Sequence, residues 1–313
     1  MHLAVYLPLL LPLLAAPGAR WLDDRLHPRP AALLLAGGAL VLAAGSTTVL
    51  GLLALAGLVR VPAVARLAEL SPAVLQRDDP ASVSVAVVAA LLLPVVVVAG
   101  SRFVYRRVRA VCEAVLEAAC FPGQDPLVVL EEPAADAFAM PGLPGRIVVS
   151  TGMLASLDAA EREVLLAHER AHLRGHHYLY TAAVQLAVTL NPLLRPLAER
   201  VAYTLERWAD EAAAEATGDR RRVAVTVGKA ALAAKNSGGR RRLPAAALGL
   251  LGRSPRRGTP GPVPRRVAAL LAPPPKGGGW RGAAATACVA AAALCTADAV
   301  QDLHEVVRRA AGG

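Results

Sequence analysis

Two histidines in this sequence are spaced so that they can bind one metal ion. Residues 168–172 read His-Glu-Arg-Ala-His. On a helix, positions i and i+4 project from the same face, so the imidazoles of His168 and His172 can reach a common ion. Glu169 then lies beside that ion, where a carboxylate can take a proton from a metal-bound water. The pattern therefore predicts a metal centre with a catalytic base.

The residues around the two histidines predict the helix that the site needs. Asp158 and Glu161 have the spacing of a helix N-cap and its capping-box acid, and Gly175 is a suitable end point. A surface helix with two unrelated histidines is the alternative interpretation. It gives no role to Glu169, whereas the metal interpretation explains all three residues.

A third protein ligand is needed if a water molecule is to keep the fourth position of zinc. The next predicted helix, residues 196–217, carries four polar residues along one face, namely Glu199, Tyr203, Glu206 and Asp210. Glu206 could complete the site, and Asp210, one turn later, could accept the free N–H of a ligand histidine. The spacing alone does not choose Glu206 over Glu199.

A family resemblance makes that choice. His168-Glu169-x-x-His172 followed by Glu206-x-x-Ala209-Asp210 resembles the pattern of membrane gluzincin proteases, which include HtpX-type and CAAX prenyl proteases. The 34-residue spacing from His172 to Glu206, with Asn191-Pro192 between them, is closer to the BlaR/MecR antirepressor proteases. The resemblance extends over about residues 127–232. It implies one Zn²⁺ per chain, with Glu206 as the third ligand and Asp210 beside a ligand histidine.

The same resemblance implies hydrolysis of peptide bonds, with Glu169 as the base. A group must also stabilise the oxyanion, and Tyr203 or an arginine among residues 220–222 could supply it. The antirepressor receptors carry a penicillin-binding sensor after their last membrane span, whereas only about a dozen residues follow the last apolar segment here. We therefore expect no β-lactam sensing by this chain.

The composition is typical of a membrane protein, with 55% hydrophobic residues and a mean hydropathy of +0.44. Residues 3–19, 31–59 and 81–101 contain no charged residue and approach or exceed the roughly 20 residues that cross a bilayer. The first has no Lys or Arg ahead of it, so we interpret it as a retained span rather than a secretory signal. Alanine-rich residues 282–300 are the fourth predicted span.

The basic residues predict the orientation. Three arginines follow each of the first two spans, but four follow the third at once, namely Arg102, Arg106, Arg107 and Arg109. By the positive-inside rule the catalytic region faces the cytoplasm. We expect a mainly α multi-pass protein of the cell membrane, with about four transmembrane helices and a cytoplasmic α+β gluzincin zinc-protease domain that contains a small β-sheet.

The uncharged run 178–194 cannot be a single membrane span if Glu206 is a ligand, because one crossing would place His168 and Glu206 on opposite sides of the membrane. Only 33 residues lie between His172 and Glu206, too few for two crossings of about 20 residues each. We predict a hairpin over about 178–196 that associates with the membrane. An ordinary core helix of a soluble domain is the alternative.

Short apolar runs at 127–130, 137–140 and 147–149 predict strands, with a Pro/Gly-rich turn at 141–145. We expect residues 146–150 to form the edge strand that binds an extended substrate. A purely structural hairpin is the alternative.

Composition divides the chain into an N-terminal membrane domain (1–100), a protease domain (101–235), a linker (236–281), the last span (282–300) and a tail (301–313). The linker holds ten Lys or Arg and no acid, which predicts a disordered segment attracted to anionic lipid headgroups. It lacks interleaved aromatics, so we expect no direct nucleic-acid binding. His176 and His177 could be spare metal ligands or touch a substrate.

The predicted function is therefore that of a membrane zinc endopeptidase. Its partners would be the lipid bilayer and a protein or peptide substrate, such as a transcriptional repressor cut in regulatory or signalling proteolysis. Quality control of membrane proteins is an enzymatic alternative. A non-catalytic adaptor that keeps zinc for structure is another, although a structural zinc needs no base at Glu169.

Overall fold

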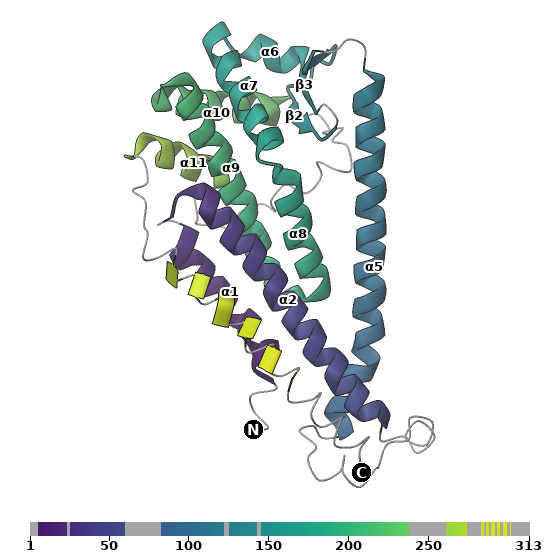
Figure 1. The fold of residues 1–313 in the computed structure, drawn as a ribbon. Helices are drawn as coiled ribbons and strands as arrows, with labels where there is room; N and C mark the ends of the chain where they lie inside the picture. Colours follow the sequence, from purple (N-terminus) through teal and green to yellow (C-terminus); the bar gives the residue numbers. More distant parts are fainter. Residues whose placement is uncertain are drawn as a thin grey trace.

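Long helices dominate the computed structural model, which describes residues 6–23, 26–59, 83–121, 125–142, 145–237, 261–273 and scattered positions within 283–301. The long helices run side by side, and shorter helices and a small sheet gather at one end of them (Figure 1). The predicted mainly helical fold with a small sheet is confirmed.

Three helices form the N-terminal part of the bundle: α1 (Leu7–Asp23), α2 (Pro28–Val59) and α5 (Val83–Cys120). Residues Pro28–Leu55 of α2 and the whole of α5 are long and apolar enough to cross a membrane, by length and composition. They cover most of the predicted spans 31–59 and 81–101. The predicted span 3–19 falls largely on α1. Eleven scattered positions of 282–300 are described, all of them helical, and of the tail only residue 301 is described.

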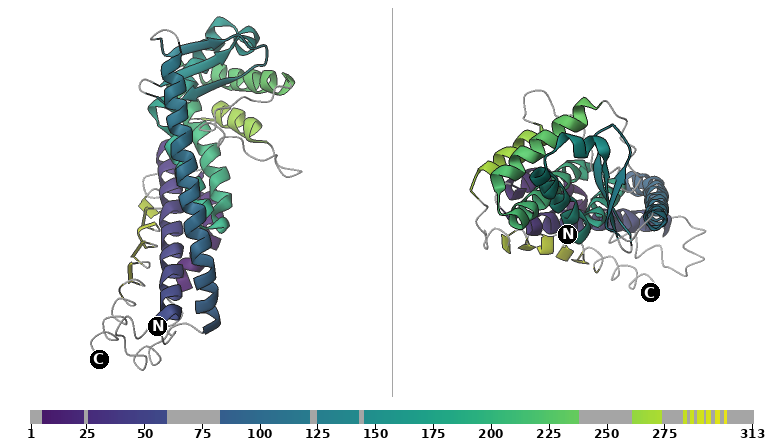
Figure 2. Two further views of the ribbon diagram at one scale, coloured as in Figure 1. Left: turned by 90° about the vertical axis from the view of Figure 1, so that its right-hand side faces the viewer. Right: turned by 90° about the horizontal axis from the view of Figure 1, so that it is seen from above.

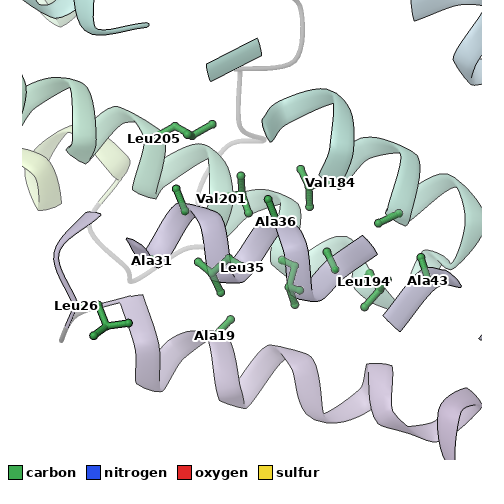
Figure 3. Close-up of a cluster of buried hydrophobic side chains, with 14 residues drawn as sticks. Ala19, Leu26, Ala31, Leu35, Ala36, Ala43, Val184, Leu194, Val201 and Leu205 are labelled. Carbon is green, nitrogen blue, oxygen red and sulfur yellow. The ribbon is translucent and has the colours of Figure 1, made fainter. Parts of the chain in front are cut away.

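The run 178–194 forms the first arm and the turn of a helical hairpin, whereas we predicted a complete hairpin within residues 178–196. Helix α8 (His177–Leu190) is followed by the 3-10 turn η2 (Pro192–Leu194) and by α9 (Arg195–Thr217). The two arms pack on α2, where alanines such as Ala31 and Ala36 allow close approach, and Val184, Leu194 and Val201 fill the contact (Figure 3). The hairpin therefore returns the chain to the level of α7. Its entry into a bilayer stays a prediction.

Asn191 links the tip of this hairpin to the middle of α2. Its side-chain oxygen accepts from the backbone N–H of Leu193 at 3.1 Å, and its Nδ2 donates to Ser46 Oγ at 3.0 Å. Ser46 in turn donates to the carbonyl of Leu42 at 2.8 Å. The amide thus caps the turn and satisfies a buried hydroxyl in an apolar surrounding.

We expect Asn191→Ala to lower the free energy of unfolding by about 1–2 kcal/mol, because one cap and one buried hydrogen bond are lost together. Chemical unfolding of the detergent-solubilised protein measures this. Asn236→Ala, at an exposed position near the end of another helix, is the matched control. Equal effects of the two substitutions would show that the link to Ser46 contributes nothing.

The sheet has the strand order β1-β3-β2, formed by β1 (Leu127–Leu130), β2 (Ala137–Met140) and β3 (Arg146–Ser150). Strand β3 pairs with β1 in parallel and with β2 in antiparallel register. The prediction that residues 146–150 form an edge strand is therefore wrong. All five of these residues are buried, because residues 147–149 are apolar and belong to the core, and both neighbouring strands occupy the backbone hydrogen-bonding groups of β3.

Four further helices complete the end of the molecule that holds the sheet: α6 (Thr151–Ser156), α7 (Ala159–Arg174), α10 (Arg220–Asn236) and α11 (Pro262–Leu271). Helix α11 packs against α9 and α10 (Figure 2). The prediction of a disordered linker over 236–281 is wrong for residues 236–237, which end α10, and for residues 261–273. Residues 238–260 and 274–281 lie outside the described residues.

Helix α11 folds because the short segment has its own apolar face and polar anchors. Leu270 is buried in a cluster with Val164 and Val223. Pro262 stands in the first turn, where its missing N–H costs no hydrogen bond. Arg220 donates to the carbonyls of the last turn, at 3.1–3.3 Å, and pairs with Glu211. The basic composition of residues 236–281 as a whole does not reveal the apolar face of residues 262–271.

Candidate metal centre

Helix α7 presents the two histidines, and its ends are those that the sequence predicts. The capping box is present: the Asp158 side chain accepts from Glu161 N at 2.9 Å, and the Glu161 side chain accepts from Asp158 N at 3.0 Å. Lys229 of α10 pairs with Glu161. The helix ends at Gly175. Its start is thus tied both locally and to a neighbouring helix.

The structure brings Glu206 of α9 to both histidines of α7. The two Nε2 atoms of His168 and His172 lie 3.2 Å apart. Glu206 places one carboxylate oxygen 3.7 Å from His168 Nε2 and the other 3.6 Å from His172 Nε2. These three residues are the group of possible metal ligands found among the described residues. Glu199, the alternative on the same helix, is exposed.

The donor set fits zinc. Zinc binds imidazole nitrogen and carboxylate oxygen at about 2.0–2.2 Å in tetrahedral geometry, which separates neighbouring donors by roughly 3.3–3.5 Å. The separations of 3.2–3.7 Å between the three side chains match that edge length. Two neutral nitrogens and one anionic oxygen leave one tetrahedral position for water or substrate.

Each histidine is held through its other ring nitrogen. His168 Nδ1 lies 3.1 Å from Asp210 Oδ1, and His172 Nδ1 lies 2.8 Å from Nδ1 of His177. In both rings Nε2 faces the other candidate ligands, while Nδ1 lies beside Asp210 in His168 and beside His177 in His172. Asp210 lies beside the candidate ligand His168, and its role in orienting that ring stays a prediction. His177 stands behind His172 instead of joining the three candidate ligands.

His177 fits behind His172 only because residue 175 is a glycine. A Cβ on Gly175 would lie 2.5 Å from His177 Nε2 and 2.9 Å from the carbonyl oxygen of Ala171. The His177 ring is buried, with its centroid 4.4 Å from that of Trp208. Gly175 thus ends α7 and also makes room for the residue that orients a candidate ligand.

Arg266 of α11 is the functional residue that the sequence analysis missed. It donates from Nε and Nη2 to the two oxygens of Asp210 at 2.7 and 2.6 Å, and its Nη1 lies 2.7 Å from Glu206 Oε2. One guanidinium thus binds a candidate ligand and the carboxylate that orients another. The available signal was the stretch 262–271, Pro-Val-Pro-Arg-Arg-Val-Ala-Ala-Leu-Leu, in which two arginines interrupt an apolar helical pattern.

The charges of this cluster set opposite protonation states for the two histidines of α7. Burial disfavours the charged form of His168, but the carboxylates of Asp210 and Glu206 outweigh it and raise the pKa of His168 to about 10. Burial lowers the pKa of His172 to about 4. Burial alone would raise the pKa of Glu206, but Arg266 and the two histidines hold that pKa well below the ordinary value. The metal-free site near neutral pH thus contains one imidazolium and one neutral imidazole.

Glu169 has the properties of a proton carrier. It is only 8% exposed, and burial raises its pKa to about 7. A carboxyl group with a pKa near the working pH can both accept and release a proton efficiently. The position directly after His168 holds this group beside the cluster.

The predicted oxyanion donors have different surroundings. Tyr203 of α9 is buried, and the guanidinium carbon of Arg265 lies 4.1 Å from the centre of its ring. Arg220 holds the end of α11, so its hydrogen bonds serve the fold. The oxyanion role of Tyr203 stays a prediction.

Comparison with known proteins supports the same class of protein. Residues 104–198, less than a third of the chain, match Peptidase family M48. No curated protein and no solved structure matches the chain. The family match supports a gluzincin-type metallopeptidase and includes both histidines and Glu169. Glu206, Asp210 and Arg266 lie beyond the matched residues, so their assignment rests on the geometry given above.

The protonation states predict that zinc binds more tightly as the pH rises. Between about pH 7.5 and 9, Glu169 and His172 are already deprotonated, whereas His168 must release one proton before its Nε2 can bind a metal. The dissociation constant should therefore fall about tenfold per pH unit. Titration against a chelator of known protonation measures this slope. We expect Asp210→Asn to flatten it, since the pKa of His168 would fall; an equally steep slope in that variant would contradict the assignment.

Proposed function

We propose that this chain is an integral membrane zinc endopeptidase that hydrolyses peptide bonds at the cytoplasmic face of the cell membrane. The observation that carries the proposal is the convergence of His168, His172 and Glu206 beside the buried carboxyl group of Glu169. A structural zinc site would need four protein ligands and no base. Three donors and an adjacent carboxyl group favour catalysis over the adaptor alternative.

In this proposal the residues of the chain divide the chemistry between them. A bound Zn²⁺ would polarise the scissile carbonyl and lower the pKa of its water. Glu169 takes the water proton and delivers it to the leaving amine. Asp210 and His177 keep the two imidazoles oriented. Arg266 holds the Glu206 and Asp210 carboxylates in place.

Strand β2 is the best candidate for substrate binding. Among the described residues it pairs with β3 alone, so one edge of β2 is open to an added strand. It also packs against α7, the helix that carries the two histidines. An extended peptide could pair with β2 through its backbone and place a peptide bond near Glu169. This replaces the edge that we predicted for residues 146–150.

The membrane assignment rests on α2 and α5, the two candidate spans. Arginines at positions 102, 106, 107 and 109 follow the apolar half of α5, which favours a cytoplasmic catalytic end. At that location the substrate would be a membrane protein or a cytoplasmic regulator such as a transcriptional repressor. Regulatory and signalling proteolysis is the role we propose.

Comparison of protein N-termini in cells that make either the wild-type chain or Glu169→Ala tests this function. We expect new N-termini that appear only with the wild type and that map to cytoplasmic segments near the membrane. Identical sets of N-termini, with both proteins present at equal levels, would argue against a peptidase. New N-termini confined to the outer face would refute the cytoplasmic assignment alone.

A further inference from the structure

A groove of about 830 Å³ lies between α5 and α8, outside the metal centre. Its α5 wall changes character along the helix, from Val95 and Val98 to Arg102, Arg106 and Arg107. The α8 wall contributes Gln185 and Thr189. The two helices run in opposite directions and lie side by side (Figure 1). The lining that the structure describes contains three cations and no acid.

The basic end of the groove holds unneutralised charge. Arg107 donates from Nη2 to the carbonyl of Tyr178 at 3.2 Å, which fixes it against the start of α8, and its buried Nε has no hydrogen-bond partner among the described residues. Arg102 and Arg106 are exposed and have no described acidic partner. Arg109 lies three positions after Arg106 on α5 but outside the lining, and its Nη2 is 2.8 Å from Glu113 Oε1. The arginines that line the groove thus have no acidic partner among the described residues.

The other end of the groove is apolar and open. Val95 is 63% exposed and Val98 is 56% exposed, in a helix apolar enough to span a membrane. Arg107 follows Val95 by twelve positions, which corresponds to about 18 Å along a helix at 1.5 Å per residue. That length accommodates a phosphate headgroup together with the upper part of an acyl chain.

We propose that this groove binds one anionic phospholipid. Its phosphate lies among the three arginines, which can donate bidentate hydrogen bonds, and one acyl chain lies along Val98 and Val95. Charge complementarity at the end of an apolar helix favours a lipid over a peptide, whose backbone would find no strand edge in this groove. The inference depends on α5 lying in the membrane and is independent of the proposed peptidase chemistry.

Native mass spectrometry of the full-length protein in detergent tests the proposal. Phosphatidylglycerol and phosphatidylcholine are supplied at equal concentrations, and the bound lipids are counted. We expect the wild type to retain one phosphatidylglycerol in preference to phosphatidylcholine. Arg106→Gln and Arg102→Gln should each lower this retention roughly fivefold. Arg109→Gln removes the same charge from the same helix and should leave it unchanged.

A second variant distinguishes lipid binding in the groove from nonspecific attraction of anionic lipids to surface charge. Val98→Trp fills the apolar half without altering any charge, at a position exposed enough to accept the larger side chain, and should also reduce retention. Equal retention of both lipids by the wild type would overturn the proposal. So would an equal loss in Arg109→Gln and Arg106→Gln, or full retention in Val98→Trp. These outcomes leave the metal centre untouched, so they are distinguishable from a failure of the proposed function.

Discussion

Glu169→Gln should abolish peptide hydrolysis while leaving zinc bound. The substitution preserves the size of the side chain and removes its ability to accept a proton. General-base catalysis typically contributes 10²–10⁴-fold, so we expect the turnover rate to fall by about three orders of magnitude. The candidate ligands His168, His172 and Glu206 are unchanged, so the zinc content should stay at that of the wild type. Cleavage of an unstructured protein by the purified variant, together with metal analysis, gives both quantities.

Glu163→Gln is the matched control for this experiment. Glu163 lies on the same helix and is exposed, so its substitution should change neither turnover nor zinc content. Wild-type turnover in Glu169→Gln would remove the proposed base from the mechanism. Loss of zinc in that variant would instead assign Glu169 to the ligands.

Arg266→Ala should destabilise the metal-free protein more than the zinc-loaded one. Without zinc, Arg266 supplies much of the positive charge that balances the buried carboxylate of Asp210 and the partly buried carboxylate of Glu206. Removing one partner of a buried ion pair typically costs about 3–5 kcal/mol. Zinc would neutralise part of the same charge, so the cost should be smaller once the metal is bound. Chemical unfolding with and without zinc measures the difference.

The neighbouring Arg265 provides the control for this prediction. It contacts the ring of Tyr203 and occupies the same helix. Arg265→Ala therefore removes one positive charge from α11, as Arg266→Ala does, but leaves Asp210 and Glu206 paired with Arg266. We expect a loss of about 1 kcal/mol or less, independent of zinc. If Arg266→Ala had the same cost with and without metal, Arg266 would serve packing alone.

The parts of the fold that the sequence predicts are those determined by local patterns. The start of α7 depends on Asp158 and Glu161, which are three residues apart and act on each other directly. A geometric argument predicted that the chain reverses between His168 and Glu206, because the two can share an ion only if they lie on the same side; the reversal is the longer α8–α9 hairpin and not a hairpin within residues 178–196. The start of α7 could be predicted from the spacing of two neighbouring residues, and the chain reversal from the requirement that His168 and Glu206 lie close together.

The parts that escaped prediction depend on contacts between distant segments. The central position of β3 is set by its pairing with both neighbours, and the apolar run 147–149 fits a central strand as well as an edge. Arg266 is 56 residues beyond Asp210 and lies in a segment whose overall composition is basic. Its ten-residue helix is too short to be stable alone and folds because Leu270 and Arg220 dock it on the domain.

Zinc analysis of Glu206→Gln tests the central claim most directly, since that claim is the convergence of three side chains on one ion. Glu199→Gln, an exposed position two turns earlier on α9, serves as the matched control, and circular dichroism verifies the fold of both variants. We predict one zinc per chain in the wild type and in Glu199→Gln, and a loss of tightly bound zinc in Glu206→Gln. One tightly bound zinc per folded chain of Glu206→Gln would contradict the account.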